Sequence, residues 1–361
     1  MSFLHVVIPV YNALPFLRET VASILDQPYK EIDVVLVDDG SSDGSGALCD
    51  ELAAQNERVS VIHQDNAGVS AARNAGIAYF LNQNSQGYLA FLDADDLWCP
   101  DTVTDEIMQN INHDGMELFV FGSTCSNSKA DRFAHPYVYQ KKCADGGNKS
   151  VWSVRNTFCA VFYPLKELQK WSIRFINGLK YSEDKIFLMQ CVFFAEKVQF
   201  LPDILHIYRD NRSSAMKKVN TITPIDYYLP IINGWIASDE FVNSWENVSG
   251  RHITAGCVLA GIYFLDMAAE HYMRWGKKKD LDQIFTKHPR FDLFLDMKPQ
   301  EVNAQQFKNH ELLLKHPLLY KLKYNLIGIG WFAARLLLRN RWVFQFRQHR
   351  KYPLVEMPIN R

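Results

Sequence analysis

The sequence lacks paired cysteine motifs and long apolar runs, and each absence excludes a class of protein. Its seven cysteines are an odd number, and no two have the Cys-x-x-Cys spacing of a zinc or redox site. Reduced thiols in a cytosolic protein are therefore expected rather than a disulfide framework. No stretch approaches the length of a membrane-spanning helix, which takes about 18 apolar residues or more. The chain opens on a strand-like segment without the regions of a secretory signal, which favours a cytoplasmic location.

Charge is distributed unevenly along the 361 residues. Residues 1–311 hold 29 basic and 39 acidic side chains, whereas residues 312–361 hold ten basic side chains and one acidic side chain. Within the tail at 312–351, Lys and Arg are interspersed with large apolar residues, which is typical of an amphipathic helix on anionic lipid. A basic helix docked on the acidic body and a nucleic-acid patch are the alternatives. We expect peripheral contact with the inner face of the cell membrane and no nucleic-acid partner.

Strand-like and helix-like segments alternate in the first third of the chain. Short apolar runs indicate buried strands, and segments with helical spacing lie between them. The strands are expected at 4–10, 32–37, 59–62, 88–92 and 118–121, and the helices at 14–25, 44–54, 69–81 and from Pro100 onward. This alternation predicts an α/β fold with a doubly wound, mostly parallel sheet. Later segments predict a helix at 182–194, short strands at 198–201 and 204–208, and a mainly helical C-terminal extension.

The most informative stretch is Asp93-Ala94-Asp95-Asp96, which directly follows the strand predicted at 88–92. Its three carboxylates repel one another unless a positive charge lies among them. Oxygen ligands suit Mg²⁺ and Mn²⁺, and Mg²⁺ is usually held by one or two protein carboxylates together with substrate phosphates. The cluster therefore predicts a metal–diphosphate site. A solvated acidic turn that caps the next helix is the alternative.

Polar turns also follow the first three predicted strands. They are Tyr11-Asn12, the segment Asp38–Ser45 and the segment Gln64–Gly68. Ligands bind beyond the carboxyl ends of the strands in open α/β sheets, so these turns and the acidic cluster are predicted to line one crevice. Tyr11 is suited to stack on a flat base there, or else is a half-buried aromatic. Asp39 is suited to accept a hydrogen bond from a base or ribose, or else caps the Gly-Ser turn.

Further candidates lie outside these turns. Arg73 is placed to reach a phosphate or a base edge, or else to pair with an aspartate of the same crevice. Glu183 and Asp184 open a predicted helix, where a carboxylate serves either as a general base or as a partner of the helix dipole. His206 is either a structural histidine or a metal ligand. Arg209 is the better candidate for contact with a diphosphate.

In their order along the chain, four of these stretches resemble the family 2 glycosyltransferases with the GT-A fold. They are Ile8-Pro9-Val10-Tyr11-Asn12, Val37–Ser45, Gln64–Gly76 and Asp93-Ala94-Asp95-Asp96. The resemblance covers residues 3–125 closely and extends loosely to about 215, where Glu183-Asp184 also matches the family's Glu-Asp motif.

The resemblance implies a role for each matching residue. Tyr11 and Asp39 would hold a uracil, and Asp184 would be the base that deprotonates the acceptor hydroxyl, with Glu183 as the second choice. Asp95 would bind Mn²⁺ or Mg²⁺ on the nucleotide diphosphate. The full set expected to bind the nucleotide sugar is Pro9, Tyr11, Asp39, Asn66, Arg73, Asp93, Ala94 and Arg209. The set expected to hold the metal is Asp95, Asp93 and His206.

The sequence as a whole predicts a metal-dependent, inverting glycosyltransferase of surface-polysaccharide synthesis, acting from a UDP-sugar on a lipid-linked or oligosaccharide acceptor. Residues 1–218 would form the GT-A domain, with a nucleotide-binding half at about 1–125 and an acceptor half at about 126–218. Residues 219–361 would form the helical extension. A nucleotidyltransferase acting on a sugar phosphate is one alternative, although the turn after the first strand lacks the glycine-rich loop and lysine it would need. A non-catalytic module that binds nucleotide sugars is the other.

Overall fold

The computed structural model describes residues 3–111, 117–125, 158–179, 181–195 and 197–209. By its internal contacts the chain divides into two units, Met1–Lys218 and Val219–Arg361, and every described residue belongs to the first unit. The helical extension predicted at 219–361 and its basic tail at 312–351 therefore lie outside the described residues. Among the helices that are described, none has the length and apolar character needed to span a membrane.

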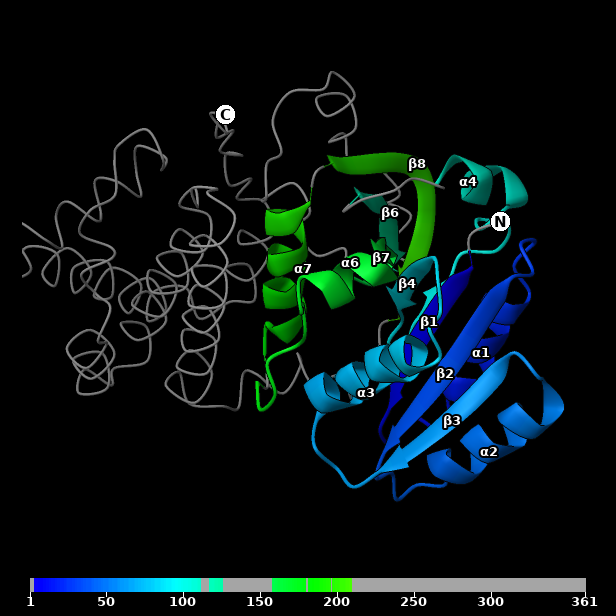
Figure 1. Cartoon of the computed structure of the whole chain (residues 1–361). Helices are drawn as coiled ribbons and strands as arrows, with labels where there is room; N and C mark the ends of the chain where they lie inside the picture. The colour runs from blue at the N-terminus through cyan, green and yellow to red at the C-terminus, as the bar shows by residue number, and fades with distance from the viewer. Residues whose placement is uncertain (1–2, 112–116, 126–157, 180, 196, 210–361) are drawn as a thin grey trace, which may run out of the picture. The chain divides into compact units, whose positions relative to one another are not determined.

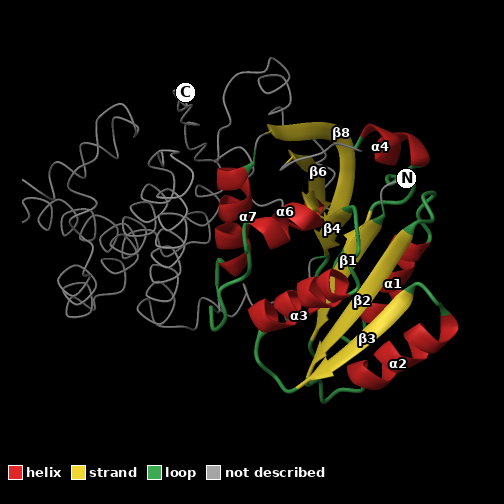
Figure 2. Ribbon diagram, viewed as in Figure 1, coloured by secondary structure: helices red, strands yellow, loops and turns green. Residues whose placement is uncertain are grey.

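The described residues form one mixed sheet of eight strands with helices on both faces (Figure 2). The strand order is β3-β2-β1-β4-β7-β6-β8-β5. The strands are β1 Leu4–Val10, β2 Ile32–Asp39, β3 Val59–Gln64, β4 Tyr88–Phe91, β5 Leu97–Trp98, β6 Glu117–Cys125, β7 Val161–Pro164 and β8 Lys197–Tyr208. All five strands predicted in the first third of the chain are present.

The first four strands form a parallel half-sheet. β1 pairs with β2 and with β4, and β2 pairs with β3, all in parallel. Side chains of β1, β2 and β4 are nearly all buried, as expected for strands covered on both faces. Helix α3 (Val69–Asn82) crosses in front of β1 and β2, whereas α1 (Leu17–Leu25) lies behind them and packs against α2 (Ser45–Gln55) (Figure 1). The predicted doubly wound arrangement is confirmed for this half.

The second half of the sheet is not a simple continuation of the parallel ladder. β7 pairs antiparallel with β4 on one side and with β6 on the other, so the strand predicted at 118–121 does not adjoin β4. β6 pairs in parallel with β8, and the short β5 pairs antiparallel with β8. No strand is predicted at β7 from the sequence, because its four buried residues are too few to show a period.

Several predicted boundaries differ from the structure. The helix predicted at 14–25 begins at Leu17, and the strand predicted at 118–121 extends over Glu117–Cys125. The helix expected from Pro100 begins only at Asp105, because Asp101 adopts a φ of 57° and breaks the helical path. Thr104 then caps this helix, α4 (Asp105–Asn110), by accepting a hydrogen bond from the Ile107 N–H. The two short strands predicted at 198–201 and 204–208 belong to the single strand β8, which bends as it crosses the sheet (Figure 1).

A glycine lets α3 lie unusually close to β1. A Cβ atom at Gly76 would come within 2.4 Å of Val7 Cγ1, so any larger residue would push the helix away from the strand. Arg73 lies three residues earlier and therefore on the same face of α3. The close approach carries the buried Arg73 toward the strand ends.

The other described helical segments are η3 (Phe158–Ala160), α6 (Leu165–Lys170) and α7 (Glu183–Phe194). The helix predicted at 182–194 is thus confirmed as α7. Phe187 of α7 stacks on Phe175 with ring centroids 4.1 Å apart, and it meets Phe91 of β4 edge to face. These aromatic contacts fix the start of α7 against the end of β4.

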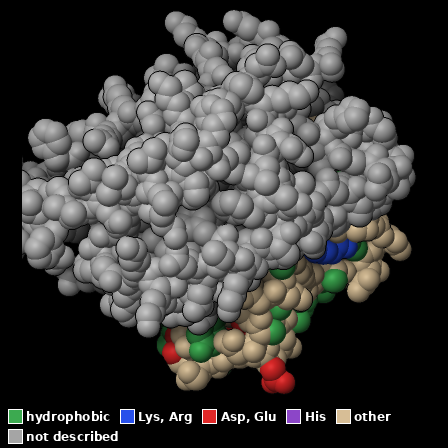
Figure 3. Space-filling model, turned by 90° about the vertical axis from the view of Figure 1, so that its left-hand side faces the viewer, with side chains coloured by type: hydrophobic (Ala, Val, Ile, Leu, Met, Phe, Trp, Pro, Cys, Tyr) green, Lys and Arg blue, Asp and Glu red, His purple; other side chains and the backbone are tan. Residues whose placement is uncertain are grey.

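Charged side chains do not gather into a broad patch on the described surface that Figure 3 shows. Acidic and basic groups lie apart from one another on that face. The tail at 312–351, in which basic residues outnumber acidic ones, lies outside the described residues.

Candidate active site

The turns that follow β1, β2, β3 and β4 meet at one edge of the sheet. The turn after β2 is bonded to the turn after β1 through Asn12 and Ser41, and to the turn after β3 through Asp39 and Gly68. Arg73, in the first turns of α3, reaches Asp93 after β4. The predicted convergence of these four turns is therefore present in the structure.

Asp39 is committed to the turn after β3. Its Oδ1 accepts hydrogen bonds from Gln64 Nε2 at 2.7 Å and from the Ala67 N–H at 2.8 Å, and its Oδ2 accepts one from the Gly68 N–H at 2.9 Å. The side chain is buried, so the carboxylate sets the shape of this turn. Asn66, within the same turn, is exposed. The expected contact of Asp39 with uracil stays a prediction and would use the remaining lone pairs.

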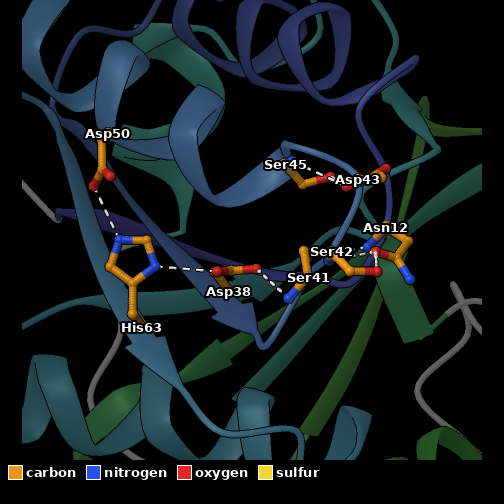
Figure 4. A network of polar contacts seen from close by, with 8 residues as sticks. All are labelled: Asn12, Asp38, Ser41, Ser42, Asp43, Ser45, Asp50 and His63. Atoms are coloured by element: carbon orange, nitrogen blue, oxygen red, sulfur yellow. Dashed lines mark hydrogen bonds and ion pairs between the residues drawn. The ribbon is translucent and has the colours of Figure 1, made fainter.

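The turn after β1 is held by the turn after β2. The backbone N–H groups of Asn12, Ala13 and Leu14 donate in succession to the side chains of Ser41, Ser45 and Asp43. Asn12 adopts a left-handed φ of 49°, and its Oδ1 accepts a hydrogen bond from the Ser42 N–H (Figure 4).

Tyr11 projects from this braced turn and is 56% exposed. Pro9, two residues earlier in β1, is half-buried. An exposed aromatic ring on a fixed backbone is suited to stack on a planar group. The alternative of a half-buried aromatic does not describe Tyr11.

Arg73 joins two carboxylates that are distant in the sequence. Its Nη2 lies 2.7 Å from Asp93 Oδ1, and its Nη1 lies 3.0 Å from Glu183 Oε1. The guanidinium is buried between the rings of Phe158 and Phe175, at 4.9 Å and 5.3 Å from their centroids. Of the two possibilities stated for Arg73, the structure has the pair with an aspartate. A direct contact with the donor stays a prediction.

Glu183 and Asp184 differ in their surroundings although they are neighbours. The Glu183 carboxylate is bonded to Arg73, and burial raises the pKa of Glu183 to about 7, with Arg73 opposing the rise and Asp184 adding to it. Asp184 is half-buried, and no described residue forms a hydrogen bond or an ion pair with its carboxylate. Of this pair, Asp184 is therefore the carboxylate without a hydrogen-bond or ion-pair partner among the described residues.

Asp93, Ala94 and Asp95 lie directly after β4. The Asp93 side chain is 41% exposed and uses one oxygen for Arg73, whereas Ala94 is buried and Asp95 is half-buried. No group of three His, Cys, Asp or Glu side chains within the described residues is arranged to hold a metal ion. Two carboxylates next to a bound diphosphate are nevertheless a donor set that Mg²⁺ or Mn²⁺ accepts.

Asp96 has a structural role that the sequence did not reveal. Its Oδ2 lies 2.8 Å from His206 Nε2, and its Oδ1 accepts a hydrogen bond from the Arg209 N–H at 2.8 Å. The idea that Asp96 caps the next helix is wrong, because Thr104 caps α4. Asp96 instead joins the acidic cluster to β8. Its partner His206 is 110 residues away in the sequence, so no local pattern indicates this contact.

Both ring nitrogens of His206 have protein partners. Nε2 faces Asp96, and Nδ1 lies 2.7 Å from Ser123 Oγ. The imidazole is also buried. Binding of a metal by His206, which stays untested, would require the ring to give up one of these two partners.

Arg209 lies at the end of β8, where its side chain turns toward α1. Its Nη1 lies 2.7 Å from Glu19 Oε2, and the guanidinium stacks 5.2 Å from the centroid of the Phe16 ring. Its Nε and Nη2 are buried and have no hydrogen-bond partner among the described residues. These donors suit an acceptor such as a phosphate oxygen, and the contact of Arg209 with a diphosphate stays a prediction.

Comparison with known proteins identifies the family. Residues 5–167 match the model of glycosyl transferase family 2. Glycosyltransferase GlyG of Streptococcus pneumoniae is 30% identical over 228 residues, which are 60% of this chain and 73% of GlyG. The succinoglycan biosynthesis protein ExoW of Rhizobium meliloti is 26% identical over 313 residues, or 81% of this chain and 92% of ExoW.

Solved structures agree on the fold. The crystal structure of S. aureus TarS 1-349 superposes with a TM-score of 0.63, at 17% identity over 99% of this chain and 95% of that one. The complex of the same protein with UDP-GlcNAc gives 0.51, at 18% identity over 86% of this chain and 79% of that one. At this level of identity the likeness concerns the fold alone, and it confirms the predicted GT-A architecture. By its sequence relatives and its fold, the chain is a member of glycosyl transferase family 2.

Proposed function

We propose that this glycosyltransferase moves a sugar from a UDP-sugar to a hydroxyl group of a lipid-linked or oligosaccharide acceptor and inverts the anomeric centre. The observation that carries the proposal is that Arg73 binds both Asp93 and Glu183, which brings the start of α7 to the acidic segment after β4. Asp184, the neighbour of Glu183 in the chain, has no hydrogen-bond or ion-pair partner among the described residues. Relatives named for succinoglycan and teichuronic acid biosynthesis support a role in polysaccharide synthesis.

The donor would lie along the strand ends. Tyr11 would stack on the base, and the turn shaped by Asp39 and containing Asn66 would contact its edge. Asp93 and the backbone at Ala94 would face the ribose. The unsatisfied donors of Arg209 would bind the diphosphate. The complex of S. aureus TarS with UDP-GlcNAc supports a nucleotide sugar as the donor class.

Asp95 and Asp93 would hold a divalent cation on the diphosphate. The Asp95 carboxylate is half-buried, and Asp93 has one oxygen that is not bonded to Arg73. Mg²⁺ in a nucleotide site is usually held by one or two protein carboxylates, and these two fit that number. When bound, the cation neutralises the charge that develops on the leaving UDP.

Asp184 would act as the general base. It takes the proton of the acceptor hydroxyl while that oxygen attacks the anomeric carbon from the side opposite the diphosphate. The bond from the anomeric carbon to UDP breaks in the same displacement, so the configuration inverts. Glu183, bonded to Arg73, is less suited to this task because its carboxylate already has a cationic partner.

A thermal-shift assay with nucleotide sugars tests the donor and the cation together. A UDP-sugar with Mn²⁺, present at about 100 times its Kd, should raise the melting temperature by about 4 °C. Chelation of the metal, or the substitution Asp95→Ala, should remove most of this shift, whereas Asp105→Ala on the exposed start of α4 should not. Transfer that continues unchanged after both treatments would refute the cation. Nucleotides that bind without any transfer or donor hydrolysis would favour a non-catalytic module.

The basic tail at 312–351 is proposed to hold the protein at the cytoplasmic face of a membrane. Its nine Lys and Arg residues and no acidic ones would attract anionic headgroups, each contributing about 1 kcal/mol near the surface. A protein that lacks residues 316–361 should therefore no longer sediment with vesicles containing phosphatidylserine, and neither form should bind phosphatidylcholine vesicles. Equal sedimentation of the full and shortened chains would show that the tail is not the anchor.

A further inference from the structure

A polar network extends from Asp50 on α2 through His63 to the turn after β1 (Figure 4). His63 Nδ1 is 3.0 Å from Asp38 Oδ2, and His63 Nε2 is 2.9 Å from Asp50 Oδ1. Carboxylates accept hydrogen bonds and do not donate them, so both ring nitrogens must donate for both contacts to form. The geometry is therefore that of a protonated imidazolium between two carboxylates.

Asp38 carries the contact inward. It follows Val37 and precedes Asp39 in β2, so its side chain points to the opposite face of the sheet from Asp39. It is buried against the first turn of α2, where a Cβ on Gly46 would come within 2.7 Å of Asp38 Oδ2. Its other oxygen, Oδ1, accepts a hydrogen bond from the Ser41 N–H at 3.1 Å. The carboxylate thus joins His63 to the turn after β2.

Ser41 completes the connection to the proposed donor site. Its Oγ accepts the Asn12 N–H at 3.0 Å, and Asn12 in turn accepts the Ser42 N–H. Asn12 is held in a left-handed conformation, which costs about 1 kcal/mol or more and needs such contacts to persist. Tyr11, the exposed aromatic, is its direct neighbour.

We propose that protonated His63 is a positioning residue for the nucleotide: by holding Asp38 it fixes the Ser41–Asn12 contact that presents Tyr11 to the base. The inference rests on the proposed function, which places the nucleotide at Tyr11. It concerns donor affinity and leaves the chemical step, at Asp184, unaffected.

The direction of the pH dependence follows from the charges that face His63. Hydrogen bonds with Asp50 and with Asp38 raise the pKa of His63 above its ordinary value. Burial raises the pKa of Asp38, but the bonds from Ser41 and His63 outweigh it and leave this pKa lowered. Cys49, the other titratable group near these carboxylates, has a pKa raised to about 12 by burial and stays neutral. The imidazolium is present at lower pH and is lost as the pH rises through the raised pKa of His63. The neutral ring keeps one N–H and therefore donates to only one of Asp38 and Asp50, which weakens its hold on Asp38.

The test measures the Kd of UDP, in the presence of Mn²⁺, from about pH 6 to about pH 9 on the full chain. Wild-type protein should bind UDP about three- to tenfold more weakly once His63 has lost its proton. His63→Gln should bind weakly at every pH with no such transition. Its kcat at saturating donor should match that of the wild type, so that only KM for the donor changes.

Asp50→Asn is the matched control, because it removes one carboxylate from His63 and keeps the bond to Asp38. The pH at which UDP affinity changes should be lower in this variant, because Asp50 raises the pKa of His63. Titration of the nucleotide itself would not move with this substitution. A wild-type Kd that is constant over the range in which the His63 ring titrates by NMR would overturn the inference alone. Absence of UDP binding by the wild type at every pH would overturn the donor site and the inference with it.

Discussion

Replacing Asp184 with Asn should lower the rate of sugar transfer by about a thousandfold, because a positioned general base contributes about 10²- to 10⁴-fold. The amide keeps the size of the side chain but does not accept the proton of the acceptor hydroxyl. The carboxylate has no hydrogen-bond or ion-pair partner among the described residues, so folding should be little affected. Transfer is measured as UDP release with acceptor present, and UDP affinity by calorimetry. UDP should bind the variant nearly as well as the wild type.

Glu183→Gln is the matched control for Asp184→Asn. The amide oxygen of Gln still accepts a hydrogen bond from Arg73, so the connection to Asp93 is kept and transfer should fall far less. A large loss in Glu183→Gln together with an active Asp184→Asn would exchange the roles of the two residues. Loss of UDP binding in Asp184→Asn would indicate a structural role for this carboxylate.

Replacing Arg73 with Met should lower the free energy of unfolding by about 3 kcal/mol, near the low end for removal of one partner of a buried ion pair. Glu183 is buried enough to feel the loss of its counter-charge strongly, whereas Asp93 is partly screened by solvent. The guanidinium also fills the space between Phe158 and Phe175, which Met occupies without its charge. Urea unfolding followed by circular dichroism measures the change.

Two further variants define what the Arg73 result means. Arg73→Lys keeps the charge but not the fork that reaches both carboxylates, so its stability should be intermediate. Arg18→Met removes an arginine from an exposed pair with Glu51 and should change stability little. If Arg73→Met were as stable as Arg18→Met, the pair would not hold the start of α7 to the end of β4.

Sequence patterns predicted the parallel half of the sheet, which contains β1, β2, β3 and β4. Strands buried on both faces show as apolar runs, so β1, β2 and β4 were placed within a few residues. The half-buried edge strand β3 was also placed within a few residues. The antiparallel β7 was missed because four residues carry no period, and its place between β4 and β6 is decided by tertiary pairing. The start of α4 was misplaced because proline signals a first helical turn only where the next residues can adopt helical angles.

The sequence predicted which residues form the candidate site better than it predicted the contacts between them. Tyr11, Asp39 and the acidic cluster were predicted from their position, because ligands bind beyond the carboxyl ends of parallel strands. Local sequence cannot reveal that Arg73 would join Asp93 to Glu183, because the partners lie 20 and 110 residues away. The bond between Asp96 and His206 was missed for the same reason.

The antiparallel β7 has a consequence for how the protein can be divided. It fills the place between β4 and β6, so the nucleotide-binding strands and the strands that follow belong to one continuous sheet. A fragment that stopped after β6 would leave the backbone groups of Tyr88 and Leu89 at an open, apolar edge, which invites aggregation. The two halves of the sheet on either side of β7 are therefore parts of a single folding unit. A chimera that combines the donor half of one relative with the acceptor half of another would have to keep the pairing of β7 with β4 and β6.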